Sequence, residues 1–249
     1  MENNRNLDSI ASYLQTFAKP SEVAKAINRF PKFNESFNAM VFWNLFLVHY
    51  EYVNNEKFIV TESSKTFVFT ILYYFLQEQN FYKSPLLFNY DKCKTSLQKG
   101  LIVVGGFGVG KTSTVRTIVS LIEKVSVNYR VYPVRFHNTL EIVEEFESSD
   151  SIFKNDVINR YSKGFRVFDD VKNEREASNF GKVDLFKEIL YKRCETKNYR
   201  TILLCNYDSE YPNDMHQAIE SFERYGDRNF DRLFEAFNFI EFKGRSNRS

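Results

Sequence analysis

The stretch LIVVGGFGVGKTST, at positions 101–114, constrains the fold of this 249-residue chain more than any other. Its first residues, 101–105, form a short apolar run, which predicts a strand buried in a parallel sheet. A glycine-rich turn, a lysine and hydroxyl side chains follow. Apolar residues then return at the spacing of one helical face: Val115, Ile118, Val119 and Ile122. The pattern predicts a strand, a tight turn and a helix in direct succession.

The turn has the spacing of a phosphate-binding loop, with Gly105, four residues, Gly110, Lys111 and Thr112. Its glycines permit positive φ and a close approach of the backbone, so successive N–H groups can surround a phosphate. The helix that begins near Lys111 directs its free N–H groups at the same anion. We expect Lys111 to lie between the outer phosphates and the Thr112 hydroxyl to bind Mg²⁺.

Two carboxylates follow another apolar run, in the stretch FRVFDD at 165–170. Asp169 is expected at the carboxyl end of a strand, where it would hold the Mg²⁺ shell. Asp170 is then positioned to orient and deprotonate an attacking water, with Glu174 as a candidate to assist it. Glutamate is more usual at the second position, so the shorter Asp170 predicts slow hydrolysis. A solvated turn that carries two aspartates is the alternative interpretation.

Asn206 ends the next candidate strand, TILLCN at 201–206. A polar amide at the end of an apolar strand, beside the nucleotide-binding strands, suits a contact with a γ-phosphate or with water. The alternative is a simple strand-terminating asparagine in a turn. The sequence does not decide between the two.

Beyond residue 57, strands and amphipathic helices alternate, which predicts a parallel sheet with helices on both faces. Ligands of such sheets bind beyond the carboxyl ends of the strands. The expected strands are 101–105, 130–136, 165–171, 200–207 and 237–244. The expected helices are 111–124, 138–147 and 182–195, with Leu140, Val143 and Phe146 on one side of the second. Pro133 indicates that strand 130–136 lies at a sheet edge or ends there.

Residues 1–57 carry no phosphate or metal chemistry and are expected to be helical, over 21–30 and 39–53. The helix 39–53 is strongly apolar and could present a face to a partner or pack on the following domain. His49 within it is interpreted as a satisfied core or groove histidine, because no second ligand stands at helical spacing. The domain boundary is therefore predicted between 57 and 58.

Composition limits the remaining classes of function. The net charge of +2 gives no bulk argument for nucleic-acid binding, so a local basic patch is required. Three well-separated cysteines predict reduced thiols. The N-terminal residues lack the pattern of a signal peptide, and the longest apolar run, 67–76, is too short to span a bilayer. We expect a soluble, cytoplasmic protein without membrane partners.

Arginines recur at the spacing of one helical face near the end of the chain, at Arg224, Arg228 and Arg232, although Gly226 leaves the first turn open. Pairing with Asp227 and Asp231 is the simple structural interpretation. An oligomeric P-loop ATPase also needs an arginine that reaches the γ-phosphate of a neighbouring subunit, and commonly a second arginine in cis. Arg232 and Arg245 are the candidates for these two roles.

Together, the ordered motifs GGFGVGKTS, FDDVKNE, TILLCNY, YGDRNFDRLFE and FKGRSNR resemble those of AAA+ ATPases of the DnaC type. These are helicase loaders, and the IstB-like transposition helpers are their relatives. The resemblance covers roughly residues 60–249. It implies a P-loop NTPase (AAA+) α/β fold with a five-stranded parallel sheet flanked by helices, following a small helical N-terminal region. It also implies that no C-terminal lid domain is present, since the chain ends four residues after Arg245.

The same resemblance implies ATP and Mg²⁺ as cofactors. It assigns Thr112 and Asp169 to the metal, a catalytic acid at Asp170 and a first sensor at Asn206. It assigns a trans arginine finger to Arg232 and a second sensor to Arg245, and leaves Arg228 open between a finger and structural pairing. The residues implied to contact ATP are Gly105, Gly106, Phe107, Gly108, Val109, Gly110, Lys111, Thr112 and Ser113.

The function implied is ATP-driven loading or remodelling of a replicative DNA helicase on single-stranded DNA. It implies a homo-oligomer formed on ATP or DNA, with 1–57 as the partner-binding region and 58–249 as the AAA+ domain. Lys163 and Arg166, in YSKGFR, are candidates for DNA contact. Alternatives are a transposition helper acting with a transposase, a slow-hydrolysing nucleotide-dependent switch, which Asp170 favours, and a small-molecule kinase.

Overall fold

The computed structural model describes residues 30–90, 93–178, 182–195 and 200–244. Contacts divide the chain into the units Met1–Phe30 and Pro31–Ser249, and the second is described below. The predicted helix 21–30 and the candidate Arg245 lie outside the described residues. Among those residues, no helix is both long enough and apolar enough to cross a membrane. All three cysteines are free thiols, as predicted.

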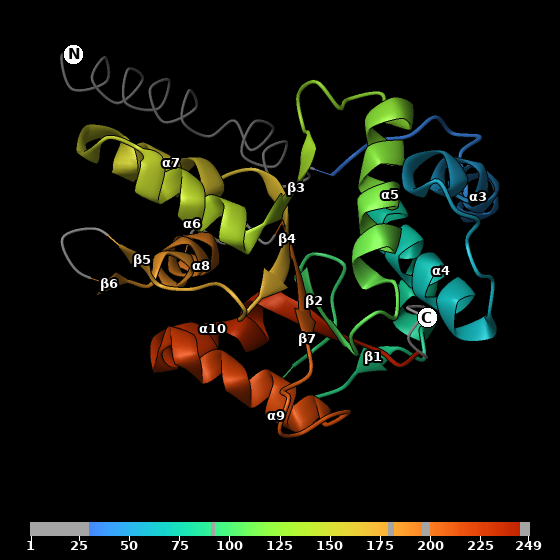
Figure 1. The fold of residues 1–249 in the computed structure, drawn as a ribbon. Coiled ribbons are helices and arrows are strands. Elements are labelled where there is room, and N and C mark those ends of the chain that lie inside the picture. Colours follow the sequence, from blue (N-terminus) through green and yellow to red (C-terminus); the bar gives the residue numbers. More distant parts are fainter. Residues whose placement is uncertain (1–29, 91–92, 179–181, 196–199, 245–249) are drawn as a thin grey trace, which may run out of the picture. The chain divides into compact units, whose positions relative to one another are not determined.

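A six-stranded sheet with the order β1-β8-β2-β7-β4-β3 forms the centre of this unit (Figure 1). Five of its strands are parallel, and the two-residue β1 pairs antiparallel with β8. The predicted five-stranded parallel sheet is confirmed, with β1 as an addition. The strands are β1 (Leu87–Phe88), β2 (Gly100–Gly105), β3 (Val134–Asn138), β4 (Phe165–Val171), β7 (Thr201–Asn206) and β8 (Phe237–Phe242).

Helices cover both faces of the sheet (Figure 1). One face carries α3 (Ala39–Asn54), α4 (Glu62–Leu76) and α5 (Lys111–Val125). The other carries α6 (Thr139–Ser148), α7 (Lys154–Tyr161), α8 (Leu185–Glu195), α9 (Met215–Glu220) and α10 (Asp227–Ala236). Short 3-10 turns η1 (Gln79–Lys83), η2 (Ser151–Phe153) and η3 (Ser221–Tyr225) connect them, and β5 (Ala177–Ser178) pairs with β6 (Lys182–Val183).

The helix α3 packs on α5, which is the helix of the phosphate-binding loop. It starts where the Asn38 side chain accepts hydrogen bonds from two backbone N–H groups and ends at Asn55 in the left-handed region. One face is buried, with Phe42 and Phe46 fully so. The opposite face exposes apolar side chains: Met40, Val41, Leu45, Val48, Tyr52 and Val53. The compact unit begins at Pro31, so α3 lies in one unit with α5, upstream of the boundary predicted at 57.

Three local predictions need correction. The strand expected over 130–136 begins only at Val134, because Pro133 cannot donate to the ladder, and β3 is an edge strand. On α6, Leu140 is 42% exposed and Ile142 takes the buried position instead. Arg224 lies in η3 and not on α10, because Gly226, at φ +88°, separates the two elements.

Candidate phosphate and metal site

The phosphate-binding loop lies between β2 and α5, as the sequence predicts. At the end of β2 the chain runs close to β8: a Cβ at Gly105 would stand 2.5 Å from the Phe242 carbonyl oxygen. Gly110, at φ +92°, turns the chain into the helix and serves as its N-cap. Lys111 is the first residue of α5, so the free N–H groups of its first turn face the loop.

Lys111 and Asn206 meet at the carboxyl ends of adjacent strands. The Lys111 ammonium donates to the carbonyl oxygens of Gly105 at 2.8 Å and Gly106 at 2.7 Å, and to Asn206 Oδ1 at 2.9 Å. Both side chains are buried, with 7% and 9% of their surface exposed. The pairing follows from the register, in which Gly105 lies opposite Asn206. A positive charge and an amide therefore converge on one point of the loop.

Thr112 and Asp169 form the second polar pair of the site. Thr112 donates its hydroxyl hydrogen bond to Asp169 Oδ1 at 3.0 Å. Burial raises the pKa of the Asp169 carboxyl, and the charge of the adjacent Asp170 adds to the effect. A bound cation would offset the burial of the Asp169 charge and its repulsion by Asp170. A hydroxyl together with a carboxylate supplies oxygen ligands of the kind that Mg²⁺ prefers.

No cluster of three or more His, Cys, Asp or Glu side chains that could hold a metal exists among the residues described. Mg²⁺ in nucleotide sites is bound by one or two carboxylates together with phosphate oxygens and water, so such a cluster is not required. The pair Thr112 and Asp169 therefore fits a nucleotide-borne Mg²⁺ better than a metal held by the protein alone.

Asp170 occupies a bulge in β4, where the register with β7 shifts between Phe168 and Val171. Its backbone lies in the left-handed region at φ +57°, and its exposed carboxylate accepts from Asn138 Nδ2 at 3.2 Å. Aspartate and asparagine tolerate this region better than other side chains that carry a Cβ. This conformation gives a physical reason for an aspartate here instead of the longer glutamate.

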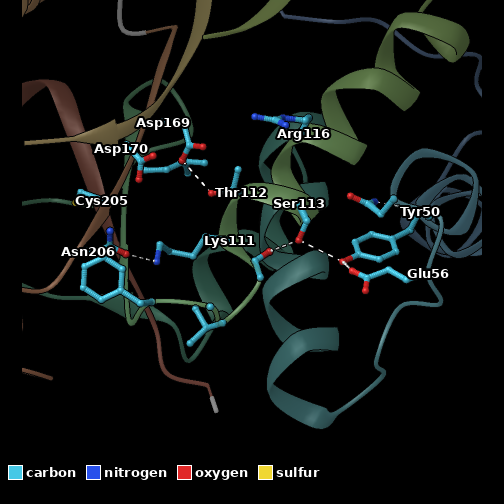
Figure 2. Close-up of a pocket in the computed structure, with 16 residues that line it drawn as sticks. Tyr50, Glu56, Lys111, Thr112, Ser113, Arg116, Asp169, Asp170, Cys205 and Asn206 are labelled. Atoms are coloured by element: carbon cyan, nitrogen blue, oxygen red, sulfur yellow. Dashed lines mark hydrogen bonds between the residues drawn. The ribbon is translucent and has the colours of Figure 1, made fainter. Parts of the chain in front are cut away.

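These groups line one cavity of about 370 Å³ at the carboxyl ends of the central strands (Figure 2). Its other end is formed by Tyr50, Asn54 and Glu56, and Arg116, whose charge acts on Asp169, also lines the cavity; the sequence analysis missed all four. No motif marks the first three, which come from α3 and the chain after it, far from the loop in sequence. Phe107, at the tip of the loop, is 64% exposed at the rim.

Glu174 lies outside this cavity, which corrects its proposed part in hydrolysis. Its carboxylate is buried and accepts from the Tyr225 hydroxyl and from the Lys172 backbone N–H at 2.8 Å. Arg224 is 3.7 Å away and also donates to the Lys172 carbonyl oxygen. Burial raises the pKa of Glu174. Glu174 therefore ties the chain after β4 to η3.

Arg228 and Arg232 lie on α10, and both guanidinium groups stand 5.1 Å from the centre of the Tyr191 ring on α8. The ion pair recorded for Arg232 is with Glu195, at 4.0 Å, and not with Asp227 or Asp231. These arginines do not line the cavity of their own chain.

Lys163 is exposed before β4, in the loop that the sequence analysis expected. Arg166 differs from that expectation, because it is buried and donates to the carbonyl oxygens of Lys163 and Arg160, both at 2.9 Å. Of the two candidates for DNA contact, only Lys163 is accessible.

No protein-family model matches this sequence, and no curated protein does. Solved structures do match. The chain is similar to DnaI (24% identity, 60% of this chain and 73% of that chain covered, TM-score 0.43). It is also similar to the DnaC helicase loader (22% identity, 58% and 78% covered, TM-score 0.43). A third similar structure is AMPPCP-bound DnaA from Aquifex aeolicus (18% identity, 58% and 40% covered, TM-score 0.40).

Proposed function

We propose that this protein is a Mg²⁺-dependent ATPase of the AAA+ type that loads or remodels a replicative DNA helicase on single-stranded DNA. One observation carries the ATPase part. The carboxyl ends of β2, β4 and β7 bring Lys111, the Thr112–Asp169 pair and Asn206 into one cavity. A cation for the phosphates, ligands for a metal and an amide are the groups that phosphoryl transfer to water needs.

In this proposal the loop N–H groups and Lys111 hold the β- and γ-phosphates. Thr112 and Asp169 bind Mg²⁺, which neutralises charge on the phosphate oxygens when bound. Asp170, exposed on its bulge, accepts the proton of the attacking water. Asn206, freed from Lys111 by the phosphates, contacts the γ-phosphate or that water. Each step uses a side chain that already lies at the cavity.

The part of the proposal that concerns assembly rests on the motifs near the end of the chain. Arg232 would reach the γ-phosphate of a neighbouring copy, in a head-to-tail homo-oligomer formed on ATP or DNA. Its place on α10, away from the cavity of its own chain, supports that role. Arg245 would serve as the second sensor, and residues 1–57 would contact the partner.

The ATPase part is tested by turnover of the purified chain with and without single-stranded DNA. Lys111→Ala is expected to weaken ATP binding by about 2–3 kcal/mol, the contribution of a charge-assisted hydrogen bond, and to abolish turnover. Lys124→Ala is the matched control, because it removes an exposed lysine from the last turn of the same helix. Equal loss in both variants, or no loss in either, would refute the site assignment.

The partner is tested by co-purification from the native host with ATP, with identification by mass spectrometry. The loader proposal expects the hexameric replicative helicase with the wild-type chain, and its loss with Lys111→Ala but not with Lys124→Ala. Recovery of a transposase instead would indicate a role in transposition and would leave the ATPase assignments unchanged. Recovery of neither, from a chain that hydrolyses ATP, would contradict both partner assignments.

A further inference from the structure

The cavity at the phosphate-binding loop extends beyond the groups that would hold phosphates and a metal. At one end lie Lys111, Asp169 and Asn206, and at the other end lie Tyr50 and Glu56. Figure 2 shows Ser113, in the first turn of α5, between these two sets. A triphosphate at the first end leaves the second for the rest of the nucleotide.

Hydrogen bonds fix the second end to the loop helix. The Tyr50 hydroxyl lies 3.2 Å from Ser113 Oγ and 3.3 Å from Glu56 Oε1. Asn54 Nδ2 donates to the Tyr50 carbonyl oxygen and to Thr117 Oγ1, both at 3.0 Å. Tyr50 is buried, with 6% of its surface exposed, and burial raises the pKa of its hydroxyl. The end of α3 and the residue Glu56 are thus held at a defined place beside the loop.

The hydroxyl of Tyr50 has one proton and can donate to one acceptor at a time. The Glu56 carboxylate has about four acceptor positions, and its bond to Tyr50, at 3.3 Å, is a long one. Glu56 is exposed at the cavity and therefore keeps capacity to accept from a ligand.

Charge decides which part of a nucleotide lies at this end. The triphosphate belongs at the end that holds the Lys111 ammonium, where a bound Mg²⁺ would offset the charge of Asp169, and away from the Glu56 carboxylate, which repels phosphate oxygens. A nucleoside is neutral and offers hydrogen-bond donors, namely the ribose hydroxyls and the exocyclic amine of adenine. An acceptor such as Glu56 suits these donors, whereas it would repel the acceptor nitrogens of the ring.

We propose that Glu56 binds a hydrogen-bond donor of the nucleoside and that Tyr50 is the residue that positions it. The residues come from outside the motif-bearing part of the chain, so Glu56 would contribute to nucleotide affinity directly and α3 through Tyr50. The inference rests on the proposed nucleotide binding at the loop and adds the part of the ligand that the loop does not contact.

The experiment compares the affinities of the full chain for Mg²⁺–ATP and for inorganic tripolyphosphate by calorimetry. Glu56→Ala is expected to weaken ATP binding about tenfold, the loss of one or two charge-assisted hydrogen bonds, and not to weaken tripolyphosphate binding. Glu51→Ala is the matched control, since it removes an exposed carboxylate from α3 outside the cavity. It is expected to leave both affinities unchanged.

Tyr50→Phe keeps the buried ring and removes the hydroxyl that holds Glu56. It is expected to weaken ATP binding about threefold, without a loss for tripolyphosphate. A loss for both ligands would mean that the variant disturbs the loop itself, which would refute the positioning role of Tyr50.

Two analogues identify the donor. If the Glu56→Ala loss disappears with 2′-deoxy-ATP, the donor is the ribose hydroxyl. If it disappears with inosine triphosphate, which lacks the exocyclic amine, the donor is that amine. Equal affinity of Glu56→Ala and wild type for ATP, or an equal loss for ATP and tripolyphosphate, would overturn the inference. Failure of the wild-type chain to bind ATP at all would instead refute the proposed function.

Discussion

The two faces of α8 hold arginines in different ways. Toward the sheet, Arg193 is 1% exposed and donates to three carbonyl oxygens within 2.8 Å, those of Tyr161, Gly164 and Arg200. Toward α10, Arg228 and Arg232 rest on the ring of Tyr191. The Nη1 atom of Arg232 has no hydrogen-bond partner among the described residues, apart from its ion pair at 4.0 Å.

This difference separates arginines that build the fold from arginines that can serve another molecule. A guanidinium whose donors are bonded by buried carbonyl and hydroxyl oxygens, as those of Arg193 are, cannot leave them without stranding buried acceptors. A guanidinium held by a ring face and one long ion pair loses little stabilising free energy when it moves to contact another molecule. Such contacts contribute about 0.5–1 kcal/mol each. Substitutions on the two faces should therefore act on different properties.

The largest expected effect is on Arg232. If it acts as a finger on a neighbouring copy, Arg232→Ala lowers the rate of ATP hydrolysis about 10³-fold or more. Its loose contacts predict little change in the free energy of unfolding. Turnover and denaturant unfolding measure the two effects, with Arg228→Ala as the matched variant one turn earlier. A larger rate loss in Arg228→Ala would assign the finger to that residue instead.

Mixing variants tests whether the finger acts between subunits. Lys111→Ala is expected to lose turnover in its own cavity but retains Arg232, whereas Arg232→Ala retains the groups that line its own cavity. A mixture of these two inactive chains should recover part of the activity. The recovered activity comes from interfaces at which Arg232 of a Lys111→Ala chain reaches the intact cavity of an Arg232→Ala chain. No recovery, although the two chains assemble together, would contradict an arginine delivered in trans.

The next largest effect on the rate of hydrolysis is expected for Asp170, and here mixing of variants should restore no activity. Asp170→Asn keeps a residue that tolerates φ +57° and removes the proton acceptor, so hydrolysis should fall about 10²–10³-fold with ATP affinity retained. If Asp170 is the base, it acts within the cavity of its own chain, so mixing Asp170→Asn with Lys111→Ala should restore no activity. Unchanged turnover in Asp170→Asn would show that Asp170 is not the base.

The inner face of α8 predicts a stability effect. Arg193→Ala leaves buried carbonyl oxygens without a donor, so the free energy of unfolding should fall by about 3–5 kcal/mol. Lys192→Ala, on the neighbouring residue, removes a partly exposed ion pair with Glu188 and should cost less than about 1 kcal/mol. Denaturant titrations of both variants measure the difference. Equal losses of unfolding free energy in the two variants would mean that the buried contacts of Arg193 stabilise the fold no more than the partly exposed ion pair of Lys192.

The sequence could predict the parts of the site that are contiguous or follow from strand order. The glycine spacing identifies the loop, and the ends of apolar runs place Asp169 and Asn206 beside it. The bulge that puts Asp170 at positive φ was not predictable, because a two-residue pattern of aspartates fits a regular strand end equally well. Its exposure at the cavity comes from that bulge.

Other features depend on contacts between distant segments. Tyr50 and Glu56 reach the cavity only because α3 packs on α5, and the apolar pattern of α3 does not say which face does so. The spacing of the arginines placed Arg224 on the same face as Arg232, but Gly226 divides them. Nor does spacing indicate that Arg193 is buried, since most of its partners are backbone carbonyls of segments distant in sequence.

The smallest predicted effect concerns His137, whose Nε2 lies 2.9 Å from Nη1 of the buried Arg166. Arginine can only donate, so Nε2 accepts and the ring is neutral. Burial is the main cause that lowers the pKa of His137, to about 4, with the charges of Arg166, Arg135 and Arg193 next. Folding thus favours the neutral ring, and its contribution is complete above the ordinary pKa of 6.5 and lost as the pH falls through 4.

His137→Gln retains an acceptor for Arg166 and cannot titrate. Relative to this variant, the wild-type chain should lose about 1–2 kcal/mol of unfolding free energy between pH 7 and pH 4, a value reduced for partial exposure of the ring. The control His216→Gln, on α9, removes an exposed histidine that does not contact Arg166. Unfolding curves across this pH range give the comparison. An identical acid dependence in wild type and His137→Gln would mean that burial and the neighbouring arginines do not hold the ring neutral.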